Sequence, residues 1–280
     1  MASTDKYLMA AVLGWPVMHS RSPLLHNYWM GRYGLTGIYV PIEVKPDGIG
    51  DALKGLAPLG FSGCNLTIPH KQNALPFLNE IDLVAKKIGA VSCVTVREDG
   101  SLLGTNNDWY GFIENIVEAF PGWRADAGPI AVLGAGGGAR AVVHGLVERG
   151  ATEIRLINRG HERAQIIADE FDGPITPVKW EERSSALAGC AMAVNATSQG
   201  MQGMDALDID LNELPRDARV ADIIYIPKET PFLRAARERG NPIVNGLGML
   251  LHQGRPAWKL WFGVDVEVTK ELRAKIEATL

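Results

Sequence analysis

Short hydrophobic segments alternate with helix-like stretches along the first hundred residues. Four of these segments are short and rich in apolar or β-branched side chains, which is typical of strands. They span residues 8–13, 38–44, 64–67 and 90–96. Residues 23–33 and 47–56 are expected to be helices, the first with Ser22 as its N-cap and Pro23 at its first helical position. Because strands alternate with helices, we expect parallel strand pairing in an α/β layer.

A second and more regular series of hydrophobic segments begins near residue 128. Five apolar runs are expected to be buried strands. They span residues 129–133, 153–157, 192–194, 220–224 and 242–244. A glycine-rich turn over residues 134–139 leads into an expected helix over residues 140–150, and a further helix is expected over residues 162–171. This alternation predicts a Rossmann-like, doubly wound sheet.

The helical pattern also predicts how the chain divides into domains. We expect a helix over residues 109–120 that leads into the second series, and two helices over residues 250–262 and 268–280 that return to the first. The predicted fold class is α/β, with one domain formed by residues 1–108 plus 247–280 and the other by residues 109–246.

Composition and charge narrow the class of protein. Hydrophobic residues make up 46% and charged residues 21% of the 280 residues, which is ordinary globular usage. The net charge is −4 and no Lys/Arg cluster occurs, so we expect no nucleic-acid partner. No apolar run approaches the length of a membrane span, and the short run at residues 7–14 follows no basic leader, so we interpret it as a strand and expect no membrane partner.

The cysteines and histidines suggest no metal centre. Cys64, Cys93 and Cys190 are scattered and have no metal-ligand spacing, which favours reduced thiols and a cytoplasmic location over a disulfide framework. None of the six histidines has a recognisable carboxylate or nucleophile partner in the sequence, and we interpret all of them as structural or surface residues. We therefore expect no metal.

The glycine turn matches the G-x-G-x-x-G/A fingerprint of dinucleotide-binding domains. Gly134 permits the tight turn, Gly136 allows the backbone to approach a pyrophosphate, and Ala139 allows close helix–sheet packing. The helix that follows offers N–H groups and a positive dipole end to phosphates. The motif alone is weak, but a strand precedes it, a helix follows, and a second strand ends about 20 residues later. We therefore predict a dinucleotide site at this turn.

The end of that second strand favours NADP over NAD. NAD-binding domains usually have an acidic residue here that accepts from the ribose 2′-hydroxyl. This chain has Asn158 and Arg159, with Arg163 one helical turn later. Two guanidiniums can bind a 2′-phosphate with paired hydrogen bonds. A solvated arginine pair at a helix start is the structural alternative.

Three polar clusters lie where ligands bind in open α/β sheets, beyond the carboxyl ends of predicted strands. They occur in the segments GWPVMHSRSPLLHN, GCNLTIPHK and GTNND, and their polar side chains are Ser20, Ser22, Asn65, Thr67, Lys71 and Asp108. Each has a structural alternative: Ser22 and Asp108 as helix caps, and Lys71 as a surface lysine.

Taken together, eight segments resemble the shikimate dehydrogenases in content and order. They are GWPVMHSRSPLLHN, NLTIPHK, GTNND, LGAGGGARA, NRGHERA, NATSQGM, DIIYIPKETPFL and NGLGMLLHQ. The resemblance covers nearly the whole chain and implies membership in the shikimate/quinate dehydrogenase superfamily. That family reduces 3-dehydroshikimate to shikimate with NADPH and closes a substrate domain over a Rossmann domain. It implies that residues 1–108 plus 247–280 form the substrate-binding and catalytic domain and residues 109–246 the dinucleotide-binding domain.

Position by position, the resemblance implies a set of site residues. Lys71 and Asp108 would be the catalytic pair, since an ammonium can stabilise and protonate the alkoxide formed by hydride transfer and a carboxylate keeps it charged. The implied substrate-binding residues are Ser20, Ser22, Asn65, Thr67, Ser92, Tyr225 and Gln253. The implied cofactor-binding residues are Gly134, Ala135, Gly136, Gly137, Gly138, Ala139, Asn158, Arg159, Arg163, Thr197, Ile223 and Gly246.

Three positions depart from the family pattern. Ser92 stands where the family usually has Asn, Asn107 where it usually has Thr, and Trp109 where Gly is common. These changes leave open a paralogue that acts on quinate or a related cyclic polyol acid. A non-catalytic NADP-binding sensor on the same fold is a more remote alternative. The expected assembly is a monomer or a homodimer.

Overall fold

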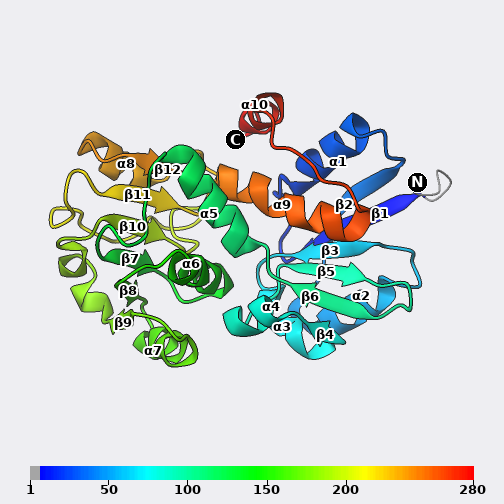
Figure 1. Ribbon diagram of the computed structural model, residues 1–280, viewed down its shortest axis with the longest axis horizontal. Helices are drawn as coiled ribbons and strands as arrows, with labels where there is room; N and C mark the ends of the chain where they lie inside the picture. The colour runs from blue at the N-terminus through cyan, green and yellow to red at the C-terminus, as the bar shows by residue number, and fades with distance from the viewer. Residues whose placement is uncertain (1–6) are drawn as a thin grey trace. The chain divides into compact units, whose positions relative to one another are not determined.

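The computed structural model describes residues 7–280 and divides into two compact units (Figure 1). The first unit comprises the chain up to Asn107 together with Gln253–Thr279, and the second comprises Asp108–His252 with Leu280. Residues 1–6 of the predicted substrate domain lie outside the described residues. Helix α9, Leu247–Phe262, begins in the second unit and ends in the first.

The sheet of the first unit is mixed, with strand order β2-β1-β3-β5-β6-β4. The strands are β1 (Leu8–Gly14), β2 (Gly37–Glu43), β3 (Gly63–Leu66), β4 (Glu80–Ile81), β5 (Cys93–Val96) and β6 (Leu102–Thr105). β1 pairs in parallel with β2 and β3, as expected, but β5 is antiparallel to both β3 and β6. Purely parallel pairing is therefore wrong here. Only residues 97–101 join β5 to β6, which is a hairpin connection and too short for a crossover.

Both faces of this sheet are buried. In β1, Ala11 packs in one cluster with Ile49 of helix α2 (Ile49–Gly55), while the next residue, Val12, packs in another with Trp261 of α9. This alternation follows from the two-residue period of a strand. The further helices of this unit are α1 (Ser22–Arg32), α3 (His70–Asn73), α4 (Leu83–Ile88) and α10 (Lys270–Glu277).

The C-terminal segment packs on the first unit, which confirms the predicted return. The indole Nε1–H of Trp29 donates to the carbonyl of Glu267 at 2.9 Å, and that of Trp258 donates to Nδ1 of His26 at 2.7 Å. His26 is buried and stacks on Tyr39 with ring centroids 4.0 Å apart. Burial lowers the pKa of His26 to about 3, so the ring is neutral and can accept this hydrogen bond.

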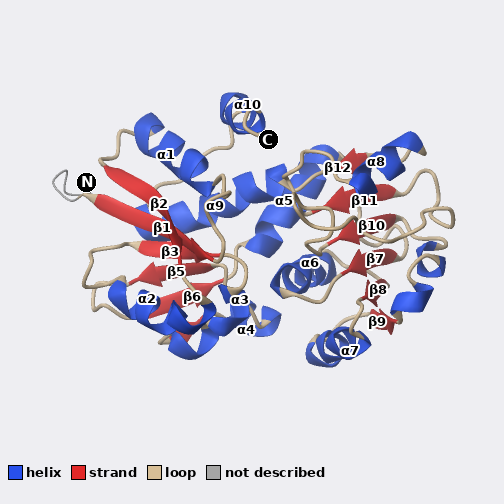
Figure 2. Ribbon diagram, turned by 180° about the vertical axis from the view of Figure 1, so that it is seen from behind, coloured by secondary structure: helices blue, strands red, loops and turns tan. Residues whose placement is uncertain are grey.

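The second unit contains a fully parallel sheet with order β12-β11-β10-β7-β8-β9 (Figure 2). Its strands are β7 (Ile130–Leu133), β8 (Ile154–Ile157), β9 (Ile175–Val178), β10 (Met192–Asn195), β11 (Arg219–Asp222) and β12 (Ile243–Val244). Its helices besides α9 are α5 (Asp108–Ala119), α6 (Gly137–Glu148), α7 (His161–Glu170) and α8 (Pro231–Glu238). Counted from β7, the order is that of a Rossmann fold, so the predicted doubly wound sheet is confirmed.

Some elements differ from the sequence-based expectation. The sequence pattern gave no range for β4, β6, β9, α3, α4 or α8, and helix α6 begins three residues earlier than predicted. The N-cap of α1 is Arg21, and Ser22 is the first helical residue, so the prediction of Ser22 as the cap is wrong. His252 has a carboxylate partner that the sequence did not indicate, since its Nε2 lies 2.9 Å from Oε2 of Glu118.

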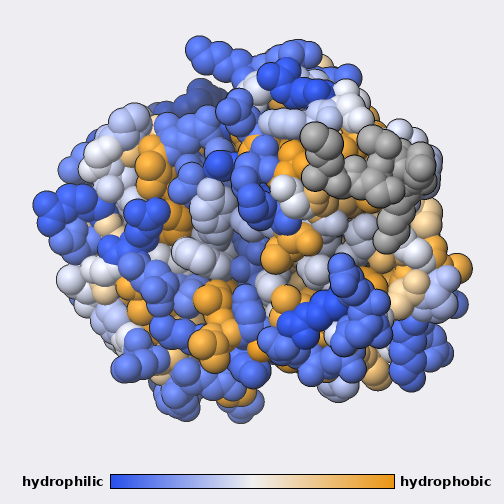
Figure 3. Space-filling model, turned by 45° about the vertical axis from the view of Figure 1, so that its right-hand side comes forward, coloured by the Kyte–Doolittle hydropathy of each residue, from blue (hydrophilic) through white to orange (hydrophobic). Residues whose placement is uncertain are grey.

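The surface drawn in Figure 3 is mainly hydrophilic, with separate smaller hydrophobic patches. Within residues 7–280, no helix combines the length and apolar character that crossing a membrane requires. In the same part of the chain, no group of three or more His, Cys, Asp or Glu side chains is arranged to hold a metal ion.

Candidate functional site

In the first unit, two polar segments meet at the carboxyl ends of β1 and β3. The backbone N–H of Trp15 donates to the carbonyl of Ile68 at 2.9 Å, and that of Thr67 donates to the carbonyl of Leu13 at 3.0 Å. A Cβ at Gly14 would lie 2.5 Å from Cγ2 of Thr67, so glycine is needed for this close approach. The fold therefore holds Thr67 beside the start of the segment that leads to the serines.

The two serines lie at the start of α1. Ser20 is half-buried and Ser22 is buried. The hydroxyl of Ser20 accepts from the backbone N–H of Ser22 at 3.2 Å and so satisfies a donor of the first helical turn. The Ser20 hydroxyl acts only as an acceptor in this bond, so its hydrogen can still be donated to a ligand.

Asn65 is fixed by a residue that the sequence did not indicate. The hydroxyl of Tyr39 donates to Oδ1 of Asn65 at 2.7 Å, and Nδ2 of Asn65 donates to the carbonyl of Ser92 at 3.2 Å. These two bonds determine which way the amide points. Tyr39 lies on β2, which β1 separates from β3, so its only sequence signal was a tyrosine within an apolar strand.

Two of the three departures from the family pattern are in contact. The buried hydroxyl of Ser92 accepts from the backbone N–H of Asn107 at 2.9 Å. Nδ2 of Asn107 is buried and has no hydrogen-bond partner among residues 7–280. The third departure, Trp109, lies in the other unit and packs edge-on against His144 with centroids 5.3 Å apart.

The candidate catalytic residues belong to different units. Lys71 lies on α3, is half-buried, and its carbonyl accepts from the N–H of Val91 at 2.7 Å. Asp108 is 1% exposed and is the first residue of α5, directly after Asn107. Gln253 lies half-buried on α9, and Tyr225 is half-buried just after β11.

The glycine turn of the second unit has the geometry that its motif predicts. Gly134 has a φ of 114°, and a Cβ there would lie 2.8 Å from the carbonyl oxygen of Ala196. Gly136 is the N-cap of α6 and has no side chain that could cap the helix. A Cβ added at this position would meet no atom within 4 Å. Packing within the protein therefore does not require glycine at 136. The open space beside an uncapped helix N-terminus fits a pyrophosphate.

The arginines after β8 are accessible. Arg159 and Arg163 are both exposed, and in the described chain neither guanidinium forms an ion pair or a side-chain hydrogen bond. The side-chain amide of Asn158 donates to the carbonyl of Gly160 at 2.9 Å and shapes the turn that presents them. The residues present thus fit a phosphate on the ribose better than they fit a hydroxyl.

Asp222 is a buried acid that the sequence did not indicate, and Asn195 connects it to Thr197. Asp222 accepts hydrogen bonds from the side chains of Asn195 at 3.1 Å and Thr230 at 2.7 Å, and from the N–H of Ile224 at 2.9 Å. Burial raises the pKa of Asp222 to about 7, while the three hydrogen bonds act in the opposite direction. A perturbed acid of this kind is a signal of a functional region.

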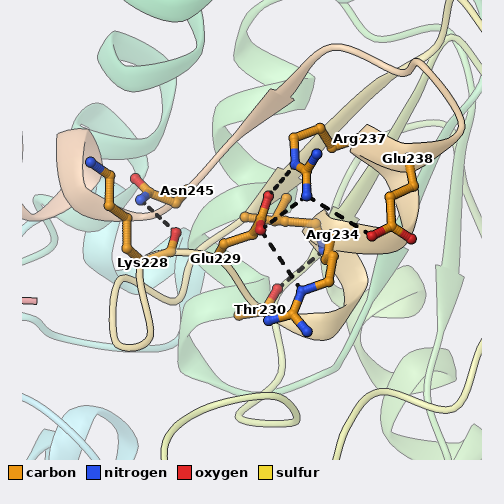
Figure 4. A network of polar contacts seen from close by, with 8 residues as sticks. Lys228, Glu229, Thr230, Arg234, Arg237, Glu238 and Asn245 are labelled. Carbon is orange, nitrogen blue, oxygen red and sulfur yellow. Dashed lines mark hydrogen bonds and ion pairs between the residues drawn. The ribbon is translucent and has the colours of Figure 1, made fainter.

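The last two predicted cofactor positions lie against each other. A Cβ at Gly246 would be 2.0 Å from the carbonyl oxygen of Ile223, and the N–H of Gly246 donates to the carbonyl of Ile224 at 2.9 Å. Figure 4 shows the neighbouring link, in which Nδ2 of Asn245 donates to the carbonyl of Lys228 at 2.9 Å. Only glycine permits this approach of the two segments.

The family of this chain follows from its matches to models of known protein families. The chain matches three models: the shikimate dehydrogenase substrate binding domain over residues 12–94, shikimate / quinate 5-dehydrogenase over residues 120–223, and the shikimate 5'-dehydrogenase C-terminal domain over residues 246–271. The chain belongs to the shikimate dehydrogenase family. The resemblance predicted from the sequence motifs is therefore confirmed.

Individual members of the shikimate dehydrogenase family match nearly the whole chain. A shikimate dehydrogenase (NADP(+)) of Paramagnetospirillum magneticum is 48% identical over 97% of this chain and 98% of its own length, and that of Rhodospirillum rubrum is 48% identical over 98% of each. Among solved structures, the Thermus thermophilus enzyme in complex with NADP(H) and shikimate is 34% identical over 97% of this chain and 99% of its own, with a TM-score of 0.85. A quinate dehydrogenase of Corynebacterium glutamicum in complex with NAD is 29% identical over 98% and 99%, with a TM-score of 0.89.

Proposed function

We propose that this chain catalyses the reversible, NADP-dependent reduction of 3-dehydroshikimate to shikimate. The observation that supports this most strongly is the 48% identity, over 97% of the chain, to a shikimate dehydrogenase (NADP(+)). The chemistry of the residues agrees, because hydroxyl and amide groups gather at one sheet edge of the first unit and a phosphate-compatible turn lies in the second. The first unit would bind the substrate and the second the dinucleotide.

The proposed substrate residues suit a ring that has a carboxylate and several hydroxyls. Hydroxyl groups and amides can both donate and accept, so they match a polyol better than charged groups would. The residues in these roles are Ser20, Ser22, Asn65, Thr67, Ser92, Tyr225 and Gln253. Tyr39 would hold the Asn65 amide with its remaining N–H available to the substrate.

Lys71 and Asp108 are proposed as the catalytic pair. When a ketone receives a hydride its oxygen becomes an alkoxide, and the Lys71 ammonium would stabilise that charge and supply the proton. Asp108 would favour the charged form of the lysine. In the reverse direction the same two groups would remove the proton from the substrate hydroxyl.

NADP would supply or accept the hydride when bound. For this dinucleotide, Gly134 to Ala139 would leave room for the pyrophosphate, and Arg159 and Arg163 would bind the 2′-phosphate. Asn158, Thr197, Ile223 and Gly246 would complete the dinucleotide contacts.

A second candidate substrate is quinate or a related cyclic polyol acid. The contact between Ser92 and Asn107 supports this second substrate, because both positions depart from the family pattern and the buried side-chain amide of Asn107 has no partner among the described residues. A hydrogen bond gained or lost in a pocket can change the preference between such substrates substantially.

The direct test is the change in absorbance at about 340 nm with purified protein, using shikimate or quinate with NADP or NAD. We expect the shikimate–NADP pair to give the highest kcat/KM. A higher kcat/KM for quinate would support the second candidate, and no turnover with either compound would favour a non-catalytic NADP-binding protein. A monomeric or homodimeric state and a cytoplasmic location remain predictions.

A further inference from the structure

A buried polar network joins the ends of β10 and β11 to the start of α8. Asn195 and Asp222 are register partners in adjacent parallel strands, and each is the last residue of its strand. Asn195 Nδ2 and Thr230 Oγ1 both donate to Oδ2 of Asp222. Asn195 and Thr230 have no exposed surface, and Asp222 is 2% exposed. Polar groups buried this deeply are costly unless they are hydrogen-bonded, so the network has one strongly preferred arrangement.

Through Asn195, this network determines the shape of the loop after β10. Oδ1 of Asn195 accepts from both the backbone N–H and the hydroxyl of Thr197, at 3.0 and 2.7 Å. Its Nδ2 donates to the carbonyl of Gln199 at 3.1 Å as well as to Asp222. All the hydrogen-bonding groups of the Asn195 amide are therefore in use, and the carboxylate of Asp222 sets its orientation.

The other carboxylate oxygen of Asp222 acts on the loop after β11. Oδ1 accepts from the N–H of Ile224 at 2.9 Å. Ile224 in turn accepts from the N–H of Gly246, and the preceding residue, Ile223, leaves no room for a side chain at 246. One acid thus fixes both the segment of Thr197 and the segment of Ile223.

We infer that Asp222 is a positioning residue for the dinucleotide site, whose carboxylate holds the loops after β10 and β11 in the geometry that binds NADP. The inference rests on the proposed function, in which Thr197, Ile223 and Gly246 contact the cofactor. An amide at 222 would not serve, because three donors converge on two acceptor oxygens and an NH₂ group would face one of them.

The energetics agree with a functional reason for this acid. All three donors to Asp222 are neutral, and burial raises its pKa to about 7, so its charged form is disfavoured relative to that of an exposed aspartate. A neutral residue would have avoided this cost of burying a charge. Such local costs are typical of residues that shape binding sites.

The test compares NADP binding by Asp222→Asn with wild type, using isothermal titration of the full chain with NADP+. We expect the Kd for NADP to rise by about tenfold or more. At saturating NADP, kcat should stay within about twofold of wild type, whereas the KM for shikimate can rise a little, because Tyr225 directly follows Ile224, whose N–H donates to Asp222. Asp172→Asn, at an exposed position of the same unit, is the matched control.

A second pair of variants keeps the inference testable if Asp222→Asn does not fold. Thr230 caps α8 and donates to Asp222, but it is no predicted cofactor contact. Thr230→Val removes the donor and Thr230→Ser keeps it, so only the valine variant should weaken NADP binding. Equal NADP binding by the two Thr230 variants, or wild-type binding by a folded Asp222→Asn, overturns the inference.

The Thr197→Val variant distinguishes failure of the inference about Asp222 from failure of the proposed function. If Thr197→Val weakens NADP binding while Asp222→Asn does not, the cofactor site stands and only the positioning role is wrong. If neither Thr197→Val nor Arg159→Ala affects NADP binding, the proposed cofactor site itself is wrong. If both Asp222→Asn and Thr197→Val weaken it, their effects should be less than additive, because they disturb the same network.

Discussion

The hydroxyl of Ser92 accepts a hydrogen bond from the backbone N–H of Asn107, with 2.9 Å between oxygen and nitrogen. The two residues are 3% and 6% exposed, so water does not replace this bond easily. The contact links two positions that both depart from the family pattern. It uses the backbone of Asn107, which leaves the side-chain amide of that residue for another partner.

The first prediction is that these two positions are energetically coupled. Ser92→Asn places a larger side chain in a buried position, whereas Asn107→Thr shortens the neighbouring side chain and replaces its unpartnered amide with a hydroxyl. We expect the double reversion to be milder than either single change, with a coupling of about 0.5 kcal/mol or more in kcat/KM for shikimate. Additive effects in the double-mutant cycle would show that the two positions are not energetically coupled. The ratio of kcat/KM for shikimate to that for quinate, measured in all four proteins, reports on specificity.

The second prediction concerns the chemistry of Lys71. Lys71→Ala should lower kcat by about a hundredfold or more, because the ammonium acts mainly on the alkoxide-like transition state. The Kd for NADP should hardly change, since Lys71 lies in the first unit and the predicted cofactor residues lie in the second. Lys54→Ala, at an exposed position of the same unit, is the matched control. Near-normal turnover of the Lys71 variant would remove it from the mechanism.

The third prediction concerns the choice of cofactor. Arg159→Ala should weaken NADP binding by about 1.5–3 kcal/mol, because charge-assisted hydrogen bonds to a phosphate would be lost. NAD binding should change little, so the preference between the cofactors narrows. Arg149→Ala, an exposed arginine of the same unit, controls for general loss of positive charge. If wild type binds NADP and NAD equally well, the arginines have no such role.

The fourth prediction is a pH dependence of stability that originates at Asp222. Its pKa is raised from 3.8 to about 7 in the folded protein, so between these values the folded state keeps a proton that the unfolded state has released. The contribution of Asp222 to stability therefore falls as pH rises through this window. From about pH 5.5 to about pH 8, wild type should lose about 2 kcal/mol relative to Asp222→Asn.

Urea denaturation of both proteins at the two pH values measures this difference, with Asp172→Asn as the control for removing one aspartate of the same unit. A constant difference in unfolding free energy between wild type and Asp222→Asn would mean that Asp222 is not the titrating group.

Local patterns in the sequence determined the parts of this protein that depend on neighbouring residues. The glycine turn was predictable because the φ of 114° at Gly134 favours glycine and a helix follows within a few residues, although α6 begins three residues earlier than predicted. Most of the alternating strands and helices of the second unit were also predictable, because each parallel strand requires a crossover connection, although β9 and α8 were missed. The ordered motifs identified the family, and the comparisons confirm it.

Only the tertiary structure decided which distant side chains meet. Tyr39 reaches Asn65 across an intervening strand, Ser92 accepts from Asn107, and Asp222 joins Asn195 to Thr230. Each contact depends on strand order and register, which one-dimensional spacing does not contain. The antiparallel β5 shows the same limit, because a hairpin sets its pairing with β6 and only the tertiary structure shows its pairing with β3. The sequence therefore determined which residues have reactive or hydrogen-bonding side chains, while strand order and register within each sheet decided which of these side chains hold one another in place.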